Sequence, residues 1–260
     1  PRGNKIASQL VNNADLIIAI GTRLGFNSTF YSYDNISKSA KIVQVDIDPI
    51  ALGRYFPIEL GINNDAKKFL ENLLTLLSLK KLKYNNSVWV NSFINERNNY
   101  YKKRDSEADI GSETIQPSGL FKELRDVMPK NSSVTLDAGT LCLQATDQFN
   151  FSESKSLFTP LDFGLVGFSF AAGLGVKLAK PNSPVFSLMG DGGFGMTVSE
   201  LSTTVQHNIN TITIVMNNKS WGAEKAYQRD YYKKRYIGAD ISSPPFHELA
   251  ELYGAKGYHI

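Results

Sequence analysis

The sequence predicts an α/β fold built from open parallel sheets with flanking helices. In the C-terminal half, Val185–Met189 is an apolar run and Thr211–Met216 is a β-branched run, and both are typical of buried strands. The segment between them, Phe194–His207, carries apolar residues at the i, i+3, i+7 spacing of one helix face. A crossover of this length fits parallel strands. Both strands then end at the same edge of the sheet, where open α/β sheets bind ligands.

The N-terminal half has the same strand and helix patterns. Asp15–Gly21 and Lys41–Asp46 are apolar runs that end at polar turns, so each is predicted as a buried strand. A helical pattern, KIASQLVNN, precedes the first of them, and Asp65–Lys80 is predicted as an amphipathic helix. We interpret residues 1–80 as the C-terminal part of one α/β domain.

A polar segment separates this part from the rest of the chain. Residues 81–116 are rich in Asn, Lys and Glu and include one helical stretch, Val88–Tyr101, so we interpret them as an interdomain connection. Residues 117–260 are interpreted as a second α/β unit. It begins with a predicted helix, Ser118–Met128, that has Pro and Ser at its head.

The predicted elements of this second unit continue with a strand at Ser133–Leu136. The last residues, Lys256–Ile260, have the composition of another strand. Because the chain opens at Pro1 and stops inside this strand pattern, we expect it to be an internal fragment of a longer protein.

Composition excludes several classes of function. A hydrophobic content of 42% and a charged content of 20% are those of a soluble globular protein, and a net charge of +3 is too small to indicate nucleic acid binding. No apolar run approaches the length of a membrane span, and there is no signal peptide. Cys142 is the only cysteine, so we expect no internal disulfide and a cytoplasmic location. The basic run Lys233–Arg235 is interpreted as a solvated helix end.

The candidate site lies where the two C-terminal strands end. Gly190-Asp191-Gly192 follows the first strand and Asn217-Asn218 ends the second, with 24 residues between them. Asp191 offers a carboxylate and Asn218 an amide oxygen, and two hard oxygen ligands suit Mg²⁺, which takes further ligands from water and phosphates. The glycines around Asp191 leave the backbone bare at a helix start, a position that favours anions. The sequence therefore predicts a metal-bridged diphosphate site.

Ordinary turns are the alternative, since Gly-Asp-Gly and Asn-Asn are both common in turns. The spacer and the second strand favour the metal site over this alternative. The glycine pattern is neither a dinucleotide fingerprint nor a Walker loop.

The motif from Gly190 to Asn218, GDGGFGMTVSELSTTVQHNINTITIVMNN, resembles the signature of the thiamine diphosphate (ThDP) enzyme family. The resemblance implies that Asp191 and Asn218 bind Mg²⁺ and that the main-chain carbonyl of Ser220 completes the protein ligands. It also implies that residues 1–80 belong to the family's central domain and residues 117–260 to its diphosphate- and Mg²⁺-binding domain.

Two further stretches are similar to this family. Asp162–Lys177 (DFGLVGFSFAAGLGVK) implies that the Gly164 carbonyl meets the aminopyrimidine and that Val166 wedges between the two cofactor rings. Asp137–Thr140 matches a turn that contacts the diphosphate. For Gly164, Gly167 and Val166 the alternative is ordinary packing, which needs no cofactor. The cofactor-binding residues implied by the resemblance are Gly139, Thr140, Gly164, Val166, Gly190, Gly192 and Gly193.

A third stretch, Asn218–Asp240, resembles the sulfoacetaldehyde acetyltransferases within this family. In related ThDP decarboxylases a catalytic carboxylate occupies the position of Glu224, so this residue is a candidate to protonate or orient a carbonyl substrate. A Glu at a helix N-terminus is also explained by the helix dipole. Trp221, Lys225 and Arg229 are candidate substrate-binding residues. Lys225 and Arg229 are four residues apart and therefore lie on one helix face. The same arrangement is typical of a basic helix face that is exposed to solvent.

The function implied by the resemblance is transfer of a two-carbon acyl unit that depends on ThDP and Mg²⁺. Sulfoacetaldehyde and phosphate would give acetyl phosphate and sulfite. One alternative is an acetolactate synthase-like enzyme that acts on pyruvate, and another is a non-catalytic ThDP-binding relative. The family's activating glutamate lies in an N-terminal domain outside this sequence, so we expect these residues alone to be inactive. The full-length protein is expected to be a homodimer or homotetramer.

Overall fold

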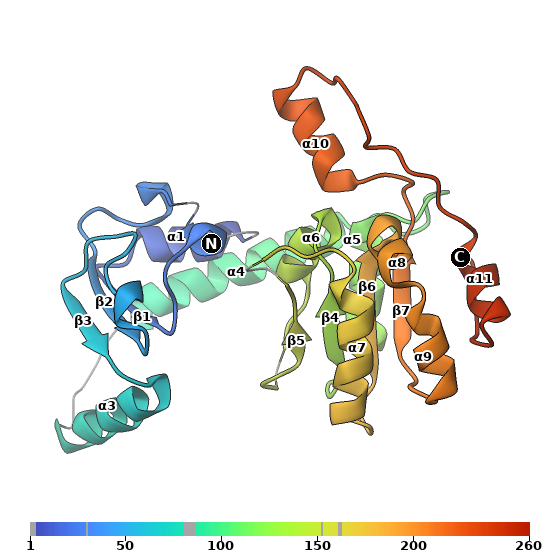
Figure 1. Cartoon of the computed structure of the whole chain (residues 1–260). Helices are drawn as coiled ribbons and strands as arrows, with labels where there is room; N and C mark the ends of the chain where they lie inside the picture. The colour runs from blue at the N-terminus through green and yellow to red at the C-terminus, as the bar shows by residue number, and fades with distance from the viewer. Residues whose placement is uncertain (1–3, 30, 81–86, 152, 161–162) are drawn as a thin grey trace. The chain divides into compact units, whose positions relative to one another are not determined.

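The computed structural model describes residues 4–29, 31–80, 87–151, 153–160 and 163–260 (Figure 1). The chain divides into two compact units, Pro1–Glu107 and Ala108–Ile260, which are described separately. The division falls inside residues 81–116, the segment interpreted as an interdomain connection. None of the helices described in either unit combines enough length and apolar character to span a bilayer.

The first unit contains a three-stranded parallel sheet in the order β1-β2-β3. Strands β1 (Leu16–Ile20) and β2 (Lys41–Asp46) confirm the positions of the two predicted strands, and β3 is Leu60–Asn63. Strand β1 was predicted to be buried, but within this chain Ala19 alone of its residues is buried. Its small core is the buried cluster of Ile36, Ile42 and Phe56. The helices of this unit are α1 (Lys5–Asn12), α2 (Phe26–Thr29), η1 (Tyr33–Asn35), η2 (Pro49–Ala51), α3 (Ala66–Lys80) and α4 (Ser87–Ser106).

The second unit contains a four-stranded parallel sheet in the order β5-β4-β6-β7. The strands are β4 (Ser133–Leu136), β5 (Leu157–Phe158), β6 (Val185–Gly190) and β7 (Ile212–Met216). The helices are α5 (Pro117–Val127), α6 (Thr140–Gln148), α7 (Phe168–Ala179), α8 (Asp191–Thr197), α9 (Glu200–Gln206), α10 (Gly222–Tyr231) and α11 (Phe246–Leu252). These parallel sheets with flanking helices confirm the predicted fold class.

Helices cover both faces of the sheet in the second unit (Figure 1). Alternate residues of β6 point to opposite faces, as in any strand. Phe186 and Leu188 pack in one buried cluster with α5 and α6, whereas Met189 packs in another with α7, α8 and α9. Because β6 is buried on both faces, its sequence is a continuous apolar run rather than an alternating one.

The predicted helix Phe194–His207 differs from the structure in two ways. The helix begins earlier, at Asp191, because an acidic side chain in the first turn is favoured by the helix dipole. It is also divided into α8 and α9, with hydrogen bonds from Leu201 to Val198 and from Ser202 to Ser199 that tighten the junction. The glycine-rich segment is therefore the first turn of a helix rather than a loop before it.

Two other sequence expectations are wrong. The segment Lys256–Ile260 forms no strand, because it pairs with no strand in the described part of the chain. Helix α10 ends at Tyr231, so Arg235 lies beyond the helix on which it was expected. Lys233 and Lys234 have φ of +54° and +60°, and this left-handed backbone does not continue the helix.

Candidate functional site

The predicted metal ligands follow two neighbouring strands of the second unit. Gly190 of β6 is in register with Met216 of β7, so Asp191 and Asn217 each come one residue after paired positions. Strand β4 ends beside them, because the Asp137 amide donates to the Leu188 carbonyl at 3.1 Å. The carboxyl edge of the sheet therefore brings together the segments that carry both halves of the motif.

Asp191 is the first residue of α8 and is only 2% exposed. Its Oδ2 accepts a hydrogen bond from the Ser243 hydroxyl at 2.6 Å. Its Oδ1 accepts no hydrogen bond within the described residues. The carboxylate therefore has one oxygen held by the protein and one available for a ligand.

The loop after β7 is held by its own polar side chains. The Oδ1 of Asn217 accepts from the Lys219 amide at 3.2 Å, and the Oδ1 of Asn218 accepts from the amide and the hydroxyl of Ser220, each at 3.1 Å. Such Asx turns let Asn residues stabilise a tight loop. Lys219 completes the loop with a φ of +53°.

Ser220 also forms an isolated antiparallel bridge with Asp240. The two hydrogen bonds of this bridge run from Trp221 to Ala239, at 2.8 Å, and from Ile241 to Lys219, at 3.0 Å. Neither bond uses the Ser220 carbonyl, and that carbonyl accepts no other hydrogen bond within the described part of the chain.

These oxygens fit a Mg²⁺ ion that also binds a diphosphate. Asp191 Oδ1 and the Ser220 carbonyl are available, while the Asn218 oxygen becomes available once the Ser220 hydroxyl rotates away from it. The described residues contain no group of three or more His, Cys, Asp or Glu that could hold a metal. An ion here would therefore need water and phosphate oxygens to complete its shell, which is the usual mode of Mg²⁺.

Two glycines bring other site residues into contact. A Cβ on Gly192 would lie 2.6 Å from the Trp221 indole, so this ring packs directly on the bare backbone of α8. A Cβ on Gly222 would lie 3.1 Å from Thr140 Oγ1 and 3.4 Å from Asn218 Nδ2. The structure thus places Thr140, from the turn after β4, beside the predicted metal loop.

Three other predicted cofactor residues border open space. An added Cβ would meet no atom within 4 Å at Gly139, Gly164 or Gly190. Gly139 and Gly164 have φ of +104° and +75°, a conformation that side chains rarely adopt. Val166 is half-buried, and Asp162, at the start of the same stretch, lies outside the described residues.

Asp137 begins the predicted diphosphate-contacting turn Asp137–Thr140, but the sequence prediction gave this residue no role of its own. It is buried, and its carboxylate accepts hydrogen bonds from the amides of Gly167 and Ser169 at 3.0 and 3.2 Å. Burial raises the pKa of Asp137, although the backbone N–H groups that point at it partly oppose this shift. A Cβ on Gly193 would lie 2.0 Å from its Oδ2. Asp137 therefore joins β4, α8 and the start of α7.

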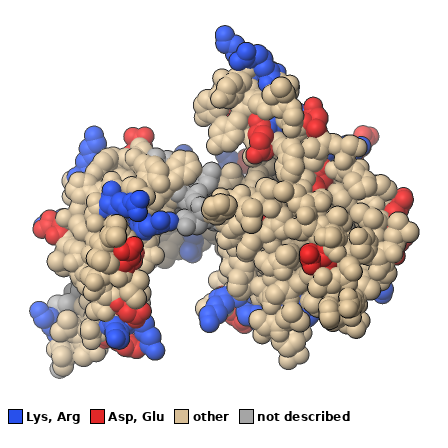
Figure 2. All heavy atoms as spheres, in the orientation of Figure 1, with Lys and Arg blue, Asp and Glu red and all other residues tan. Residues whose placement is uncertain are grey.

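The candidate residues on α10 are either exposed or paired with carboxylates. Glu224 is exposed in the first turn of the helix. Lys225 pairs with Asp240, and Arg229 donates two hydrogen bonds to its neighbour Asp230. An anionic substrate would have to compete with these carboxylates. Figure 2 shows basic side chains gathered at the outer end of α10 and the turn that follows it.

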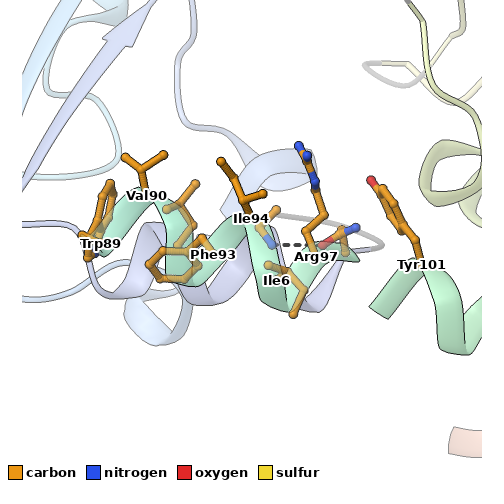
Figure 3. A pocket seen from close by; sticks show the side chains of 10 residues that line it. Ile6, Trp89, Val90, Phe93, Ile94, Arg97 and Tyr101 are labelled. Carbon is orange, nitrogen blue, oxygen red and sulfur yellow. Dashed lines mark hydrogen bonds between the residues drawn. The ribbon is translucent and has the colours of Figure 1, made fainter. Parts of the chain in front are cut away.

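A cavity of about 330 Å³ lies in the first unit and contains none of the predicted site residues. It lies between α1 and α4, and its lining is mostly apolar, with the side chains of Trp89, Phe93, Ile94 and Arg97 along one helix face (Figure 3). It brings together no groups suited to acid–base or metal chemistry.

Comparison with known proteins gives two family matches and a set of relatives. Residues 137–260 match the family model described as thiamine pyrophosphate enzyme, C-terminal TPP binding domain, and residues 1–73 match thiamine pyrophosphate enzyme, central domain. A sulfoacetaldehyde acetyltransferase of Alcaligenes xylosoxydans xylosoxydans is 31% identical over 98% of this chain and 46% of that protein. The acetolactate synthase large subunit of Haemophilus influenzae is 32% identical over 99% of this chain and 45% of that protein. The chain thus spans about half the length of these curated relatives.

Proposed function

Because this chain belongs to the thiamine pyrophosphate enzyme family, we propose that it serves the ThDP- and Mg²⁺-dependent transfer of a two-carbon acyl unit. The residues predicted as metal ligands lie in the C-terminal TPP binding domain, at the carboxyl edge of its sheet. The observation that carries the proposal is the buried carboxylate of Asp191, whose Oδ1 is left without a hydrogen bond among the described residues.

Each part of this site then has a role. Asp191 and the Asn217–Ser220 loop would hold the ion, and the diphosphate would bind beside it. When bound, ThDP would supply carbanion chemistry toward a substrate carbonyl, which protein side chains do not provide. Gly164 and Val166 would lie against the cofactor rings. The Trp221 ring packs on Gly192 and shapes the space beside the ion.

For the substrate we propose sulfoacetaldehyde, with phosphate as the acceptor and acetyl phosphate and sulfite as products. The support is the segment Asn218–Asp240 and the sulfoacetaldehyde acetyltransferases among the relatives. Acetolactate formation from pyruvate is the second candidate, because acetolactate synthase large subunits match the same residues at similar identity. Trp221, Lys225, Arg229 and Glu224 are the residues proposed to face the substrate.

One assay separates the two reactions. We expect the full-length protein, with ThDP and Mg²⁺, to release sulfite from sulfoacetaldehyde and to form acetyl phosphate only when phosphate is supplied. Acetolactate from pyruvate without sulfite release would replace this substrate assignment by the second candidate. The same preparation, run on a sizing column with light scattering, tests our further proposal that the full-length protein is a homodimer or homotetramer.

A binding measurement tests the metal site itself. Asp191→Ala in the full-length protein removes the one charged ligand proposed for the ion, so calorimetry should show that Mg²⁺-dependent ThDP binding is lost. Glu123→Ala is the matched control, because Glu123 is an exposed carboxylate on α5 of the same unit. Equal ThDP affinity in wild type and Asp191→Ala would refute the assignment.

A further inference from the structure

The carboxylate of Asp191 is held by a residue that is 52 positions away in the sequence. Ser243 Oγ donates to Asp191 Oδ2 at 2.6 Å, which is within the 2.5–2.7 Å typical of a hydroxyl bonded to a carboxylate. The adjacent oxygen, Oδ1, accepts no hydrogen bond among the described residues. Ser243 therefore distinguishes the two oxygens of a carboxylate that is otherwise symmetric.

The backbone fixes Ser243 on both sides. Before it, Ile241 donates to the Lys219 carbonyl at 3.0 Å, which ties this segment to the loop after β7. After it, Phe246 packs edge-on against Phe194 of α8, with ring centroids 5.0 Å apart. Pro244 follows Ser243 directly, and a residue before proline is restricted to extended backbone. The Ser243 hydroxyl therefore contacts Asp191 from a segment that has little freedom to move.

We infer that Ser243 is a positioning residue, which holds Asp191 so that Oδ1 alone is presented to the metal ion. This inference rests on the proposed function. Mg²⁺ demands nearly ideal octahedral geometry, so a carboxylate that binds through one defined oxygen suits it better than one that is free to turn. Partners that orient a metal ligand in this way typically account for 10- to 100-fold in metal affinity.

The same contact couples the ligands to one another. Asp191 belongs to α8, whereas Asn218 and Ser220 belong to the loop after β7. The segment that carries Ser243 is bonded to both, through Asp191 Oδ2 and through the Lys219 carbonyl. Removal of the hydroxyl would therefore loosen the alignment of the carboxylate with the loop while leaving every proposed ligand present.

Metal affinities of the full-length protein at saturating ThDP test the inference. We expect Ser243→Ala to weaken Mg²⁺ binding at least tenfold by calorimetry, while Ca²⁺ binding changes less than threefold, because Ca²⁺ tolerates irregular geometry. Ser243→Thr keeps a hydroxyl and should retain wild-type Mg²⁺ affinity. Ser242→Ala is the matched control, because Ser242 is an exposed neighbour with no hydrogen bond among the described residues.

The outcomes separate this inference from the function on which it rests. Equal Mg²⁺ affinity in wild type and Ser243→Ala, with binding lost in Asp191→Ala, would overturn the positioning role alone. Equal losses of Mg²⁺ and Ca²⁺ affinity in Ser243→Ala would show a general loosening and would also overturn it. A wild-type protein that binds no Mg²⁺ with ThDP would overturn both.

Discussion

Three glycines of α8 have different surroundings and should respond differently to the same substitution. A Cβ on Gly195 would meet nothing within 4 Å, a Cβ on Gly192 would enter the Trp221 ring, and a Cβ on Gly193 would lie 2.0 Å from Asp137 Oδ2. Alanine at each position adds the same methyl group to the same helix. Differences in stability among the three variants therefore report the surroundings rather than helix propensity.

The expected magnitudes follow from these contacts. Gly195→Ala should raise the free energy of unfolding by about 0.5–1 kcal/mol, the usual gain in a helix. Gly193→Ala should lower it by about 2–5 kcal/mol, because overpacking costs about 1–3 kcal/mol and a displaced Asp137 also weakens its hydrogen bonds to Gly167 and Ser169. Gly192→Ala should lower it by about 1 kcal/mol, since the half-buried Trp221 ring can move.

Urea unfolding followed by tryptophan fluorescence measures these differences within one unit. The chain has two tryptophans, Trp89 in the first unit and Trp221 in the second. In a Trp89→Phe background Trp221 is the one tryptophan that remains within residues 1–260. Gly192→Ala should also shift the emission maximum of the folded protein, because the ring must leave its place on α8, whereas Gly195→Ala should not.

One result would refute this reasoning. If Gly193→Ala is as stable as Gly195→Ala, then Asp137 does not occupy the space beside Gly193. The proposed link between β4, α8 and the start of α7 would then be wrong as well.

Two further predictions concern Asp137 and the segment after α10. Burial raises the pKa of Asp137, so its contribution to stability is present below the ordinary Asp pKa of about 3.9 and is lost as pH rises through the raised folded value. Asp137→Asn is always neutral and should show a flatter dependence of unfolding free energy on pH above about 4; equal slopes in the two proteins would contradict this. Gln228 exchanges two hydrogen bonds with the Ile237 backbone, at 3.0 and 2.7 Å. Gln228→Ala should therefore speed hydrogen exchange of the Ile237 amide roughly 3- to 10-fold, an effect of about 0.5–1.5 kcal/mol, and unchanged exchange would show that these bonds are not maintained in solution.

Most strands could be predicted because their sequences are short runs of mostly apolar or β-branched residues. Lys41–Asp46 and Ser133–Leu136 were predicted with the bounds that the structure has, and β1 lies within the predicted strand Asp15–Gly21. Strand β5 was missed because two residues carry too little pattern to separate a strand from a loop. Strand β3 was missed because its sequence, LGIN, contains a glycine and is mostly exposed, so it lacks the pattern of a buried strand. The Lys256–Ile260 prediction failed for the opposite reason, since a strand-like composition forms no strand without a partner.

The candidate site, like the fold, could be predicted from the sequence only in part. The sequence motif predicted that Asp191 and Asn218 follow neighbouring strands, because the crossover length fixes parallel pairing. The motif could not show that Ser243 bonds to Asp191 or that Asp137 bonds to Gly167, since these contacts join residues that are 52 and 30 positions apart. A lone serine before a proline gives no pattern from which such a contact can be inferred.

The bridge between Ser220 and Asp240 holds together the two ends of the segment between these residues. Two backbone hydrogen bonds accompany this bridge, from Ile241 to Lys219 and from Trp221 to Ala239. Helix α10 and the turn after it therefore form a loop whose two ends are held together. The entropy of closing a loop grows slowly with length, by only about 0.6 kcal/mol for each doubling. Residues 223–238 can therefore be lengthened, shortened or replaced at small cost while the ligand positions beside the bridge stay fixed. An α/β domain built in this way can change the molecule it accepts without rebuilding the place where it holds its cofactor.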